Sequence, residues 1–306
     1  MLISYFYPNK LHRLFVPYAT NHKFLDNSCT KEVDLIYCGS ASRLDKAMAA
    51  KQEYGKPLIC WVWDLPCFWR EWARNNAEFN EHAWRDKYIE NTVSNLRKCD
   101  RVISASKYTQ KILNGKYDLK SEQAYFYVDL EGINGTPLPI KKGYVIQISR
   151  LALNKRFDHS VRAASAVDRK LICIGTGKTE VLKQLAQSIL ADVEFNASVP
   201  RVKLVELLKQ AEVLLSPSLH EGWGMTPIEA IYCGTPILLS DLEVFKEVYG
   251  DSAIYHRKDD VEDMKDKLGR LIEDKALQKK IVKDCLPLVS DFTIPKFIER
   301  WEKLIR

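Results

Sequence analysis

Short, continuous apolar runs recur along the second half of the chain, and each is followed by a stretch with helical signals. Runs of this kind suit strands that are covered on both faces, and strands that alternate with helices predict a parallel, doubly wound sheet. The last helix of the series runs from Thr226 to a stop at Gly234. The expected strands are 143–149, 170–174, 192–195, 212–215 and 236–240, and the expected helices are 156–167, 180–190, 201–210 and 226–234.

The first half repeats the rhythm more loosely and predicts a second α/β unit. Glycines and prolines gather in 132–142, which places a boundary there and gives domains at 1–142 and 143–290. The chain closes with a charged amphipathic segment, 294–306. The expected strands are 2–7, 33–39, 57–63, 101–106 and 124–129, and the expected helices are 44–53, 75–98 and 107–113.

Composition narrows the class of protein. The 306 residues are 46% hydrophobic and 28% charged, which is typical of globular proteins and excludes collagen-like and disordered chains. No run approaches the roughly 20 apolar residues of a membrane span, and MLISYFYPNK lacks the basic and long apolar regions of a signal peptide. The eight cysteines form no CxxC pair, and Cys38, Cys60 and Cys173 lie in apolar runs, which indicates reduced, buried thiols rather than a zinc site.

The net charge of +6 is uneven: residues 1–142 hold 21 Lys and Arg against 16 Asp and Glu, and residues 143–306 hold 25 against 24. An excess of +5 in the first half would attract an anionic partner such as phosphate, a lipid surface or nucleic acid. The alternative is an ordinary solvated surface, which the lack of a dense basic run favours.

The segment 214–238, LLSPSLHEGWGMTPIEAIYCGTPIL, carries the clearest chemistry. It predicts a strand, a glycine-rich loop and a helix with Thr226 as N-cap, whose N-terminal N–H groups would form an anion site. Gly222 and Gly224 would allow the backbone to approach a ligand. Glu221 precedes the helix, where a carboxylate has no evident structural task. Glu229 has two readings of equal weight, a ligand contact or the partner of Thr226 in a capping box.

The spacing of Glu221 and Glu229 within this segment resembles the paired-glutamate motif of retaining GT-B glycosyltransferases, in particular the large family 4 group. Further segments agree in order over about 120 residues: 145–164, 171–185, 199–218 and 240–254. The resemblance implies two Rossmann-like, doubly wound domains that face each other across a cleft, here with a short N-terminal domain. It also implies a donor-binding domain at 143–290, an acceptor-binding domain at 1–142, and a final segment, 291–306, that packs back on the latter.

The resemblance also implies roles for residues. Arg150 and Lys155 would grip the donor diphosphate, Glu221 would contact the donor sugar and Glu229 the ribose hydroxyls. A guanidinium and an ammonium aimed at the leaving diphosphate would stabilise the transition state more than the ground state. Their alternative reading is as solvated loop residues, and the Gly175-Thr176-Gly177 sequence could equally be a tight turn. The implied donor site comprises Arg150, Lys155, Gly175, Gly177, Glu221, Gly222, Gly224, Met225, Thr226 and Glu229.

The first half departs from the family pattern. The first strand is followed by no glycine-rich loop, and Trp63 stands where many members have a histidine that reaches the donor sugar. Asp64 follows it and could line the cleft or cap a helix. Five of the seven tryptophans lie between 61 and 84; we expect Trp61 in the core and Trp63, Trp69 and Trp72 on the acceptor side. The alternative is that these aromatic side chains also belong to the core.

The resemblance therefore implies a retaining glycosyltransferase of the hexosyltransferase type that uses a UDP- or GDP-sugar, needs no cofactor and acts in glycan, polysaccharide or glycolipid synthesis. No DxD triplet occurs, so a metal-dependent reaction is disfavoured. The expected location is cytoplasmic, with peripheral contact at the inner membrane face as an open possibility for a glycan or lipid-linked acceptor. The alternatives are a nucleic-acid acceptor, other chemistry on the same fold such as an epimerase or phosphorylase, and a non-catalytic sugar-nucleotide or glycan-binding protein.

Overall fold

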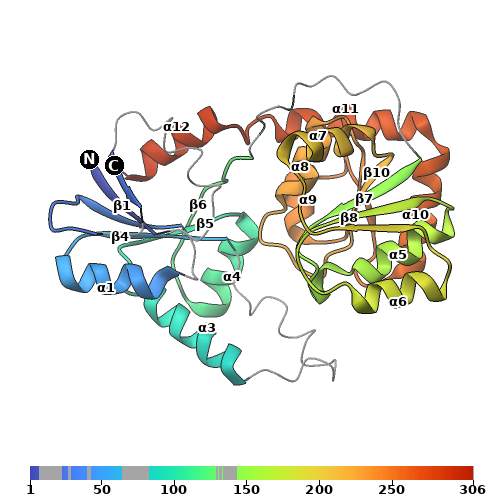
Figure 1. The fold of residues 1–306 in the computed structure, drawn as a ribbon. Helices are drawn as coiled ribbons and strands as arrows, with labels where there is room; N and C mark the ends of the chain where they lie inside the picture. The colour runs from blue at the N-terminus through green and yellow to red at the C-terminus, as the bar shows by residue number, and fades with distance from the viewer. Residues whose placement is uncertain are drawn as a thin grey trace. The chain divides into compact units, whose positions relative to one another are not determined.

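A computed structural model describes residues 1–6, 23–26, 29–39, 43–63, 83–128, 130, 133 and 143–305 of the chain. The chain divides into two compact units, Met1–Asp129 with Phe292–Arg306 and Leu130–Asp291. Each contains a six-stranded sheet, and every strand pair described is parallel. The predicted α/β class, with two doubly wound units, is confirmed (Figure 1).

The sheet of the first unit has the strand order β2-β1-β3-β4-β5-β6. The strand expected at 124–129 is wrong for the part that is described, 124–128. The strand ladder ends at Gln123, and beyond it the aromatic side chains of Phe126 and Tyr127 are buried in the core. The expected helix at 75–98 is described only from Ala83. The elements are β1 Leu2–Phe6, β2 Lys23–Asp26, β3 Leu35–Cys38, α1 Leu44–Tyr54, β4 Leu58–Val62, α3 Ala83–Leu96, β5 Arg101–Ser104, α4 Lys107–Tyr117, β6 Glu122–Gln123 and α12 Ile294–Ile305.

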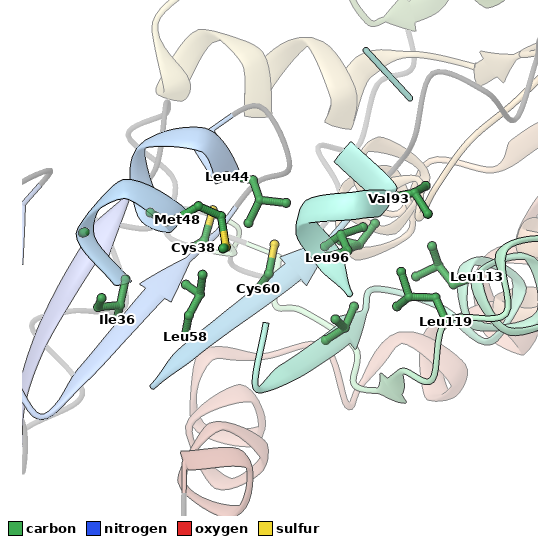
Figure 2. Close-up of a cluster of buried hydrophobic side chains, with 14 of the residues drawn as sticks. Ile36, Cys38, Leu44, Met48, Leu58, Cys60, Val93, Leu96, Leu113 and Leu119 are labelled. Carbon is green, nitrogen blue, oxygen red and sulfur yellow. The ribbon is translucent and has the colours of Figure 1, made fainter. Parts of the chain in front are cut away.

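Alternate residues of β3 and β4 supply two separate cores, because successive side chains of a strand point to opposite faces. On one face, Leu44 and Met48 of α1 pack over Cys38 and Cys60 (Figure 2). Thiol hydrogen bonding with Cys38 and Cys99, together with burial, raises the pKa of Cys60. All described cysteines are free, and Cys38, Cys60 and Cys173 are buried as expected.

The other face of this sheet is aromatic. Trp61 is fully buried, as expected, and lies 5.6 Å from Phe126 and 5.5 Å from Phe297 of α12 between ring centroids. Trp301, one turn further along α12, meets Tyr37 edge-on at 4.7 Å. The closing helix therefore forms part of the first unit's core, although almost the whole chain separates it from β1.

The second unit has the strand order β12-β11-β10-β7-β8-β9. Helix α5 packs against α6 and α10, whereas α11 packs against α8 and α9, so that helices cover both faces (Figure 1). The elements are β7 Tyr144–Ile148, the 3₁₀ turn η5 Leu153–Lys155, α5 Phe157–Ala166, β8 Lys170–Ile174, α6 Glu180–Ser188, β9 Val193–Asn196, α7 Arg201–Gln210, β10 Val213–Ser216, α8 Met225–Tyr232, β11 Ile237–Ser240, α9 Glu243–Tyr249, β12 Ile254–His256, α10 Val261–Glu273 and α11 Lys275–Val289.

None of the described helices is long and apolar enough to cross a membrane.

Candidate functional site

The strand order of the second sheet reverses between β7 and its neighbour β10: from β7 the chain moves to β8 and β9, whereas from β10 it moves to β11 and β12. The connections that leave two such strands run to opposite sides, and ligands of open α/β sheets bind outside the carboxyl ends at this point. Lys155 follows β7, and Glu221 follows β10. Topology therefore brings these two sequence-predicted residues to one place.

Backbone bonds join the two loops. The Leu219 amide, on the loop after β10, donates to the Asn154 carbonyl, on the loop after β7, at 2.8 Å. The buried amide Nε2 of Gln147 donates to the main-chain carbonyl of Lys155 at 2.7 Å. Both bonds fix the main chain around Lys155 without using its ammonium group.

The side chains of Lys155 and Glu221 form an ion pair in which Nζ lies 2.6 Å from Oε1. These side chains are only 11% and 17% exposed, so solvent screens the pair less than it screens surface ion pairs. Ser218 donates its hydroxyl to the same Oε1 at 2.7 Å. Among the described residues, Glu221 Oε2 has no hydrogen-bond partner.

Arg150 lies on the same loop and is exposed. Its guanidinium group forms no hydrogen bond or ion pair with another described residue, whereas its carbonyl accepts a bond from the Ala152 amide at 2.8 Å. The guanidinium group is thus able to take an anionic ligand without first breaking an ion pair.

Gly175 and Gly177 allow the loop after β8 to lie directly against the residues on either side of Arg150. Both have strongly positive φ, 153° and 150°. A Cβ atom on Gly175 would lie 1.7 Å from the Ser149 carbonyl oxygen, and one on Gly177 would lie 2.6 Å from Leu151 Cβ. The Leu151 amide donates to the Thr176 carbonyl at 2.8 Å. Close packing of two loops thus requires these glycines, whether or not a ligand also approaches them.

Helix α8 begins earlier than the sequence predicts. Its first residue is Met225 and its N-cap is Gly224, at φ 84°, so Thr226 as N-cap is wrong. Glycine adopts this left-handed conformation without a Cβ penalty, and a Cβ there would lie 2.6 Å from the Phe245 ring. Thr226 instead lies in the first turn, with its hydroxyl 3.4 Å from the Ile148 carbonyl. Gly222 is buried in the preceding loop.

Glu229 has a different partner from the one that a capping box would give it. Its Oε1 lies 2.5 Å from Arg201 Nη1, and the side chains are 14% and 31% exposed. With Gly224 as the N-cap and no side-chain cap bond on α8, the capping box does not form. Sequence reasoning missed Arg201; the signal was a basic residue directly after Pro200, at the start of a helix that follows a strand.

A second missed cluster adjoins Lys155. Arg156 has φ 47° and forms ion pairs with Asp158, at 3.0 Å, and with Asp259. Its guanidinium group also meets His159, whose pKa is lowered by burial and by Arg156. Asp260 is the N-cap of α10, and its side chain accepts a hydrogen bond from the Asp263 amide. These contacts join the loop after β12 to the start of α5, directly behind Lys155.

On the predicted acceptor side, only Trp63 lies within the described residues. Its Nε1 donates to the Gly39 carbonyl at 2.9 Å, and its ring lies 4.5 Å from that of Phe126. Trp63 thus packs at the edge of the aromatic core of the first unit. Asp64, Trp69 and Trp72 lie outside the described residues.

In the part of the chain that the structure describes, no group of three or more His, Cys, Asp or Glu side chains is placed to hold a metal ion. The positive charges beside Glu221 and Glu229 are instead those of Lys155 and Arg201.

Solved structures that superpose on this chain over its whole length have the GT-B fold. The chain superposes on Anabaena HepE in complex with UDP-glucose with a TM-score of 0.83 at 15% identity, over 100% of this chain and 99% of that one. It superposes on WaaG, described as a glycosyltransferase involved in lipopolysaccharide biosynthesis, with a TM-score of 0.76 at 12% identity over 100% and 99%. The GT-B fold is thereby established.

The family model for glycosyl transferases group 1 matches residues 132–284, which is half of the chain. The chain therefore belongs to this family. The O-antigen chain mannosyltransferase RfbU of Salmonella typhimurium strain LT2 is 25% identical over 173 residues, 54% of this chain and 49% of the relative. A GDP-mannose-dependent α-(1-6)-phosphatidylinositol dimannoside mannosyltransferase of Mycobacterium tuberculosis is 29% identical over 111 residues, 34% and 29%. The chain thus spans about half or less of the length of these relatives.

Proposed function

We propose that this chain transfers a hexose from a nucleoside-diphosphate sugar to a hydroxyl group of a glycan or lipid-linked acceptor, with retention of anomeric configuration. The observation that carries the proposal is the Lys155–Glu221 pair at the strand-order reversal of the second sheet. It joins a cation suited to a diphosphate with a carboxylate suited to sugar hydroxyls. Arg150 lies on the same loop as Lys155, is exposed and forms no ion pair among the described residues.

The charges account for the chemistry. When the glycosidic bond breaks, negative charge grows on the leaving diphosphate, and positive groups aimed at it lower the barrier. Lys155 supplies a point charge and Arg150 a fork of donors. Glu221 neutralises Lys155 in their ion pair, so a diphosphate would compete with Glu221 for the ammonium group. Because two cations take the charge of the leaving group, we propose that the reaction needs no divalent metal.

Glu229 is proposed to bind the ribose, because a carboxylate accepts two hydrogen bonds from a vicinal diol. Its Oε1 is held by Arg201, and this contact fixes the orientation of the carboxylate. A ribonucleotide donor follows, with UDP or GDP as the candidates. HepE was solved with UDP-glucose, and one relative is named for its dependence on GDP-mannose.

The acceptor class is proposed from the names of the relatives. One adds mannose to an O-antigen chain, and another, from Campylobacter jejuni, is an N-acetylgalactosaminyltransferase for a diphospho-undecaprenol-linked sugar; it is 23% identical over 54% of this chain and 46% of its own length. We assign acceptor binding to the first unit and donor binding to the second. A lipid-linked acceptor would bring the chain into peripheral contact with a membrane surface.

The test is product analysis with the full chain. UDP-, GDP-, ADP- and dTDP-sugars are each incubated with polyprenyl-diphosphate-linked and phosphatidylinositol-linked sugars, with and without EDTA. We expect transfer from one donor family, unchanged by EDTA, and the same anomeric configuration in donor and product by NMR. An inverted product or complete loss with EDTA contradicts the mechanism. Donor binding without transfer would favour the non-catalytic alternative.

A further inference from the structure

Two buried serine side chains lie behind Glu221 and have no role in the reaction as described so far. Ser218 is 2% exposed and follows β10, three residues before Glu221, and Ser240 is fully buried at the end of the neighbouring strand β11. Ser218 donates its hydroxyl to Glu221 Oε1 at 2.7 Å. Ser240 donates its hydroxyl to the Ser218 carbonyl at 2.5 Å. Hydrogen bonds thus run from β11, through the loop after β10, to the carboxylate.

The position of these bonds on the carboxylate matters. Lys155 and Ser218 both donate to Oε1, and Oε2 has no partner among the described residues. One oxygen is therefore held by the protein, and the other is left to accept hydrogen bonds from a ligand. A carboxylate fixed at one oxygen keeps a single orientation toward the group that meets its other oxygen.

The two donors to Oε1 differ in what a donor substrate would do to them. A diphosphate competes for the ammonium group of Lys155, because phosphate oxygens attract that charge as the carboxylate does. The diphosphate does not attract the neutral Ser218 hydroxyl in this way. Ser218 also lies on a buried backbone held by Ser240. When Lys155 turns to the diphosphate, the Ser218 bond remains to hold Glu221.

We propose that Ser218 is the positioning residue of the donor-sugar site: its hydroxyl holds Glu221 Oε1 while Lys155 serves the diphosphate, so that Oε2 faces the sugar hydroxyls. This inference rests on the proposed function. Ser218 does not touch the substrate and acts only through Glu221. It should therefore affect recognition of the sugar and leave recognition of the nucleoside diphosphate unchanged.

The test compares two ligands on each variant. Binding of the nucleoside diphosphate and of the corresponding nucleotide sugar is measured by calorimetry for the wild-type chain, Ser218→Ala and Ser218→Cys. Loss of a hydrogen bond to a charged group corresponds to about tenfold or more in affinity. We expect Ser218→Ala to bind the nucleotide sugar about tenfold more weakly and the nucleoside diphosphate within about twofold of wild type. The KM for the donor should rise by a similar factor.

Two variants separate hydrogen bonding from packing. A cysteine at 218 fills the space of the serine but donates weakly, so Ser218→Cys should behave like Ser218→Ala. Ser160 is the matched control, because it is also fully buried and its hydroxyl has no hydrogen-bond partner among the described residues. We expect Ser160→Ala to bind both ligands as the wild type does.

The outcomes are distinguishable. If the wild type binds no nucleotide sugar, the proposed function itself fails. If the wild type binds but Ser218→Ala binds the nucleotide sugar equally well, or if it loses both ligands alike, the positioning role is overturned. If Ser218→Cys behaves like the wild type, the site needs only the volume of the serine, and the role of its hydroxyl is likewise overturned.

Discussion

The two units share an architecture but use their strand ends differently. In the second unit, the carboxyl ends of β7 and β10 lead to charged side chains that pair across loops, as Lys155 and Glu221 do. In the first unit, β4 leads to Trp63, which packs against Phe126 beside a core closed by α12. A parallel sheet thus provides a location for a site at its strand ends. The side chains at those ends determine whether the location can act as a functional site.

We expect the strongest loss of activity from a substitution in the second unit. Lys155→Ala should lower kcat/KM by roughly 10²–10⁴, because it removes a charge that we propose acts on the leaving diphosphate. The measurement is initial rate against donor concentration. Lys203→Ala is the control, because the ion pair of Lys203 with Glu206, at 3.2 Å, is exposed and its loss should leave the rate unchanged. Equal rates for Lys155→Ala and the wild type would contradict a catalytic site in the second unit.

Stability should depend most on the first unit's aromatic core. Trp301→Ala removes a fully buried ring that meets Tyr37, and such truncations cost about 3–5 kcal/mol in free energy of unfolding. The measurement is urea denaturation. Because α12 belongs to the first unit, the fraction that stays native should still bind a nucleoside diphosphate with the affinity of the wild type. A loss of that affinity would contradict the assignment of donor binding to the second unit.

Two glycine substitutions compare a tightly packed loop of the second unit with a helix of the first unit. Gly175→Ala puts a Cβ into the Ser149 carbonyl at positive φ, so it should cost about 2–3 kcal/mol and disturb the loop that carries Arg150. Gly115→Ala, within α4, meets nothing within 4 Å and should stabilise the protein by about 0.5–1 kcal/mol. Thermal melts and donor binding of both variants provide the check. A Gly175→Ala protein with native stability would contradict the loop packing.

Stability should also depend on pH through two buried histidines, His159 and His256. Burial lowers the pKa values of His159 and His256 below their ordinary value near 6.5. The unfolded chain then binds protons more readily than the folded chain, so stability is fully present above about pH 6.5 and falls as pH decreases below it. Denaturation at pH 5.5 should show a loss of free energy of unfolding relative to pH 7.5. His256→Asn should reduce this loss; an unchanged loss would assign it to other groups.

Elements with continuous apolar runs could be predicted from the sequence. In the second unit, β8 and α7 begin and end where expected, because apolar periodicity and Pro200 mark their limits. The strand expected at 124–129 was wrong because an aromatic run suits a strand and a buried loop equally. Thr226 was a plausible N-cap by residue type, but Gly224 took that position since only its backbone reaches φ 84° without cost.

The site could be predicted in its members but not in its pairings. Lys155 and Glu221 were both found, yet no local pattern joins residues that lie 66 positions apart. Arg201 and Asp259 were missed because each finds its partner, Glu229 and Arg156, through the packing of distant segments. Such contacts depend on strand order, which the spacing of residues along the chain does not fix.

The most direct test of the central claim is a thermal-shift panel of the wild-type chain with UDP-, GDP-, ADP- and dTDP-sugars, each with and without magnesium. A ligand that binds only the folded state raises the melting temperature. We expect a clear rise with one ribonucleotide family, equal with and without magnesium and absent in Lys155→Ala and Glu229→Ala. No rise with any of these donors, or an equal rise in both variants, would contradict a donor site in the second unit.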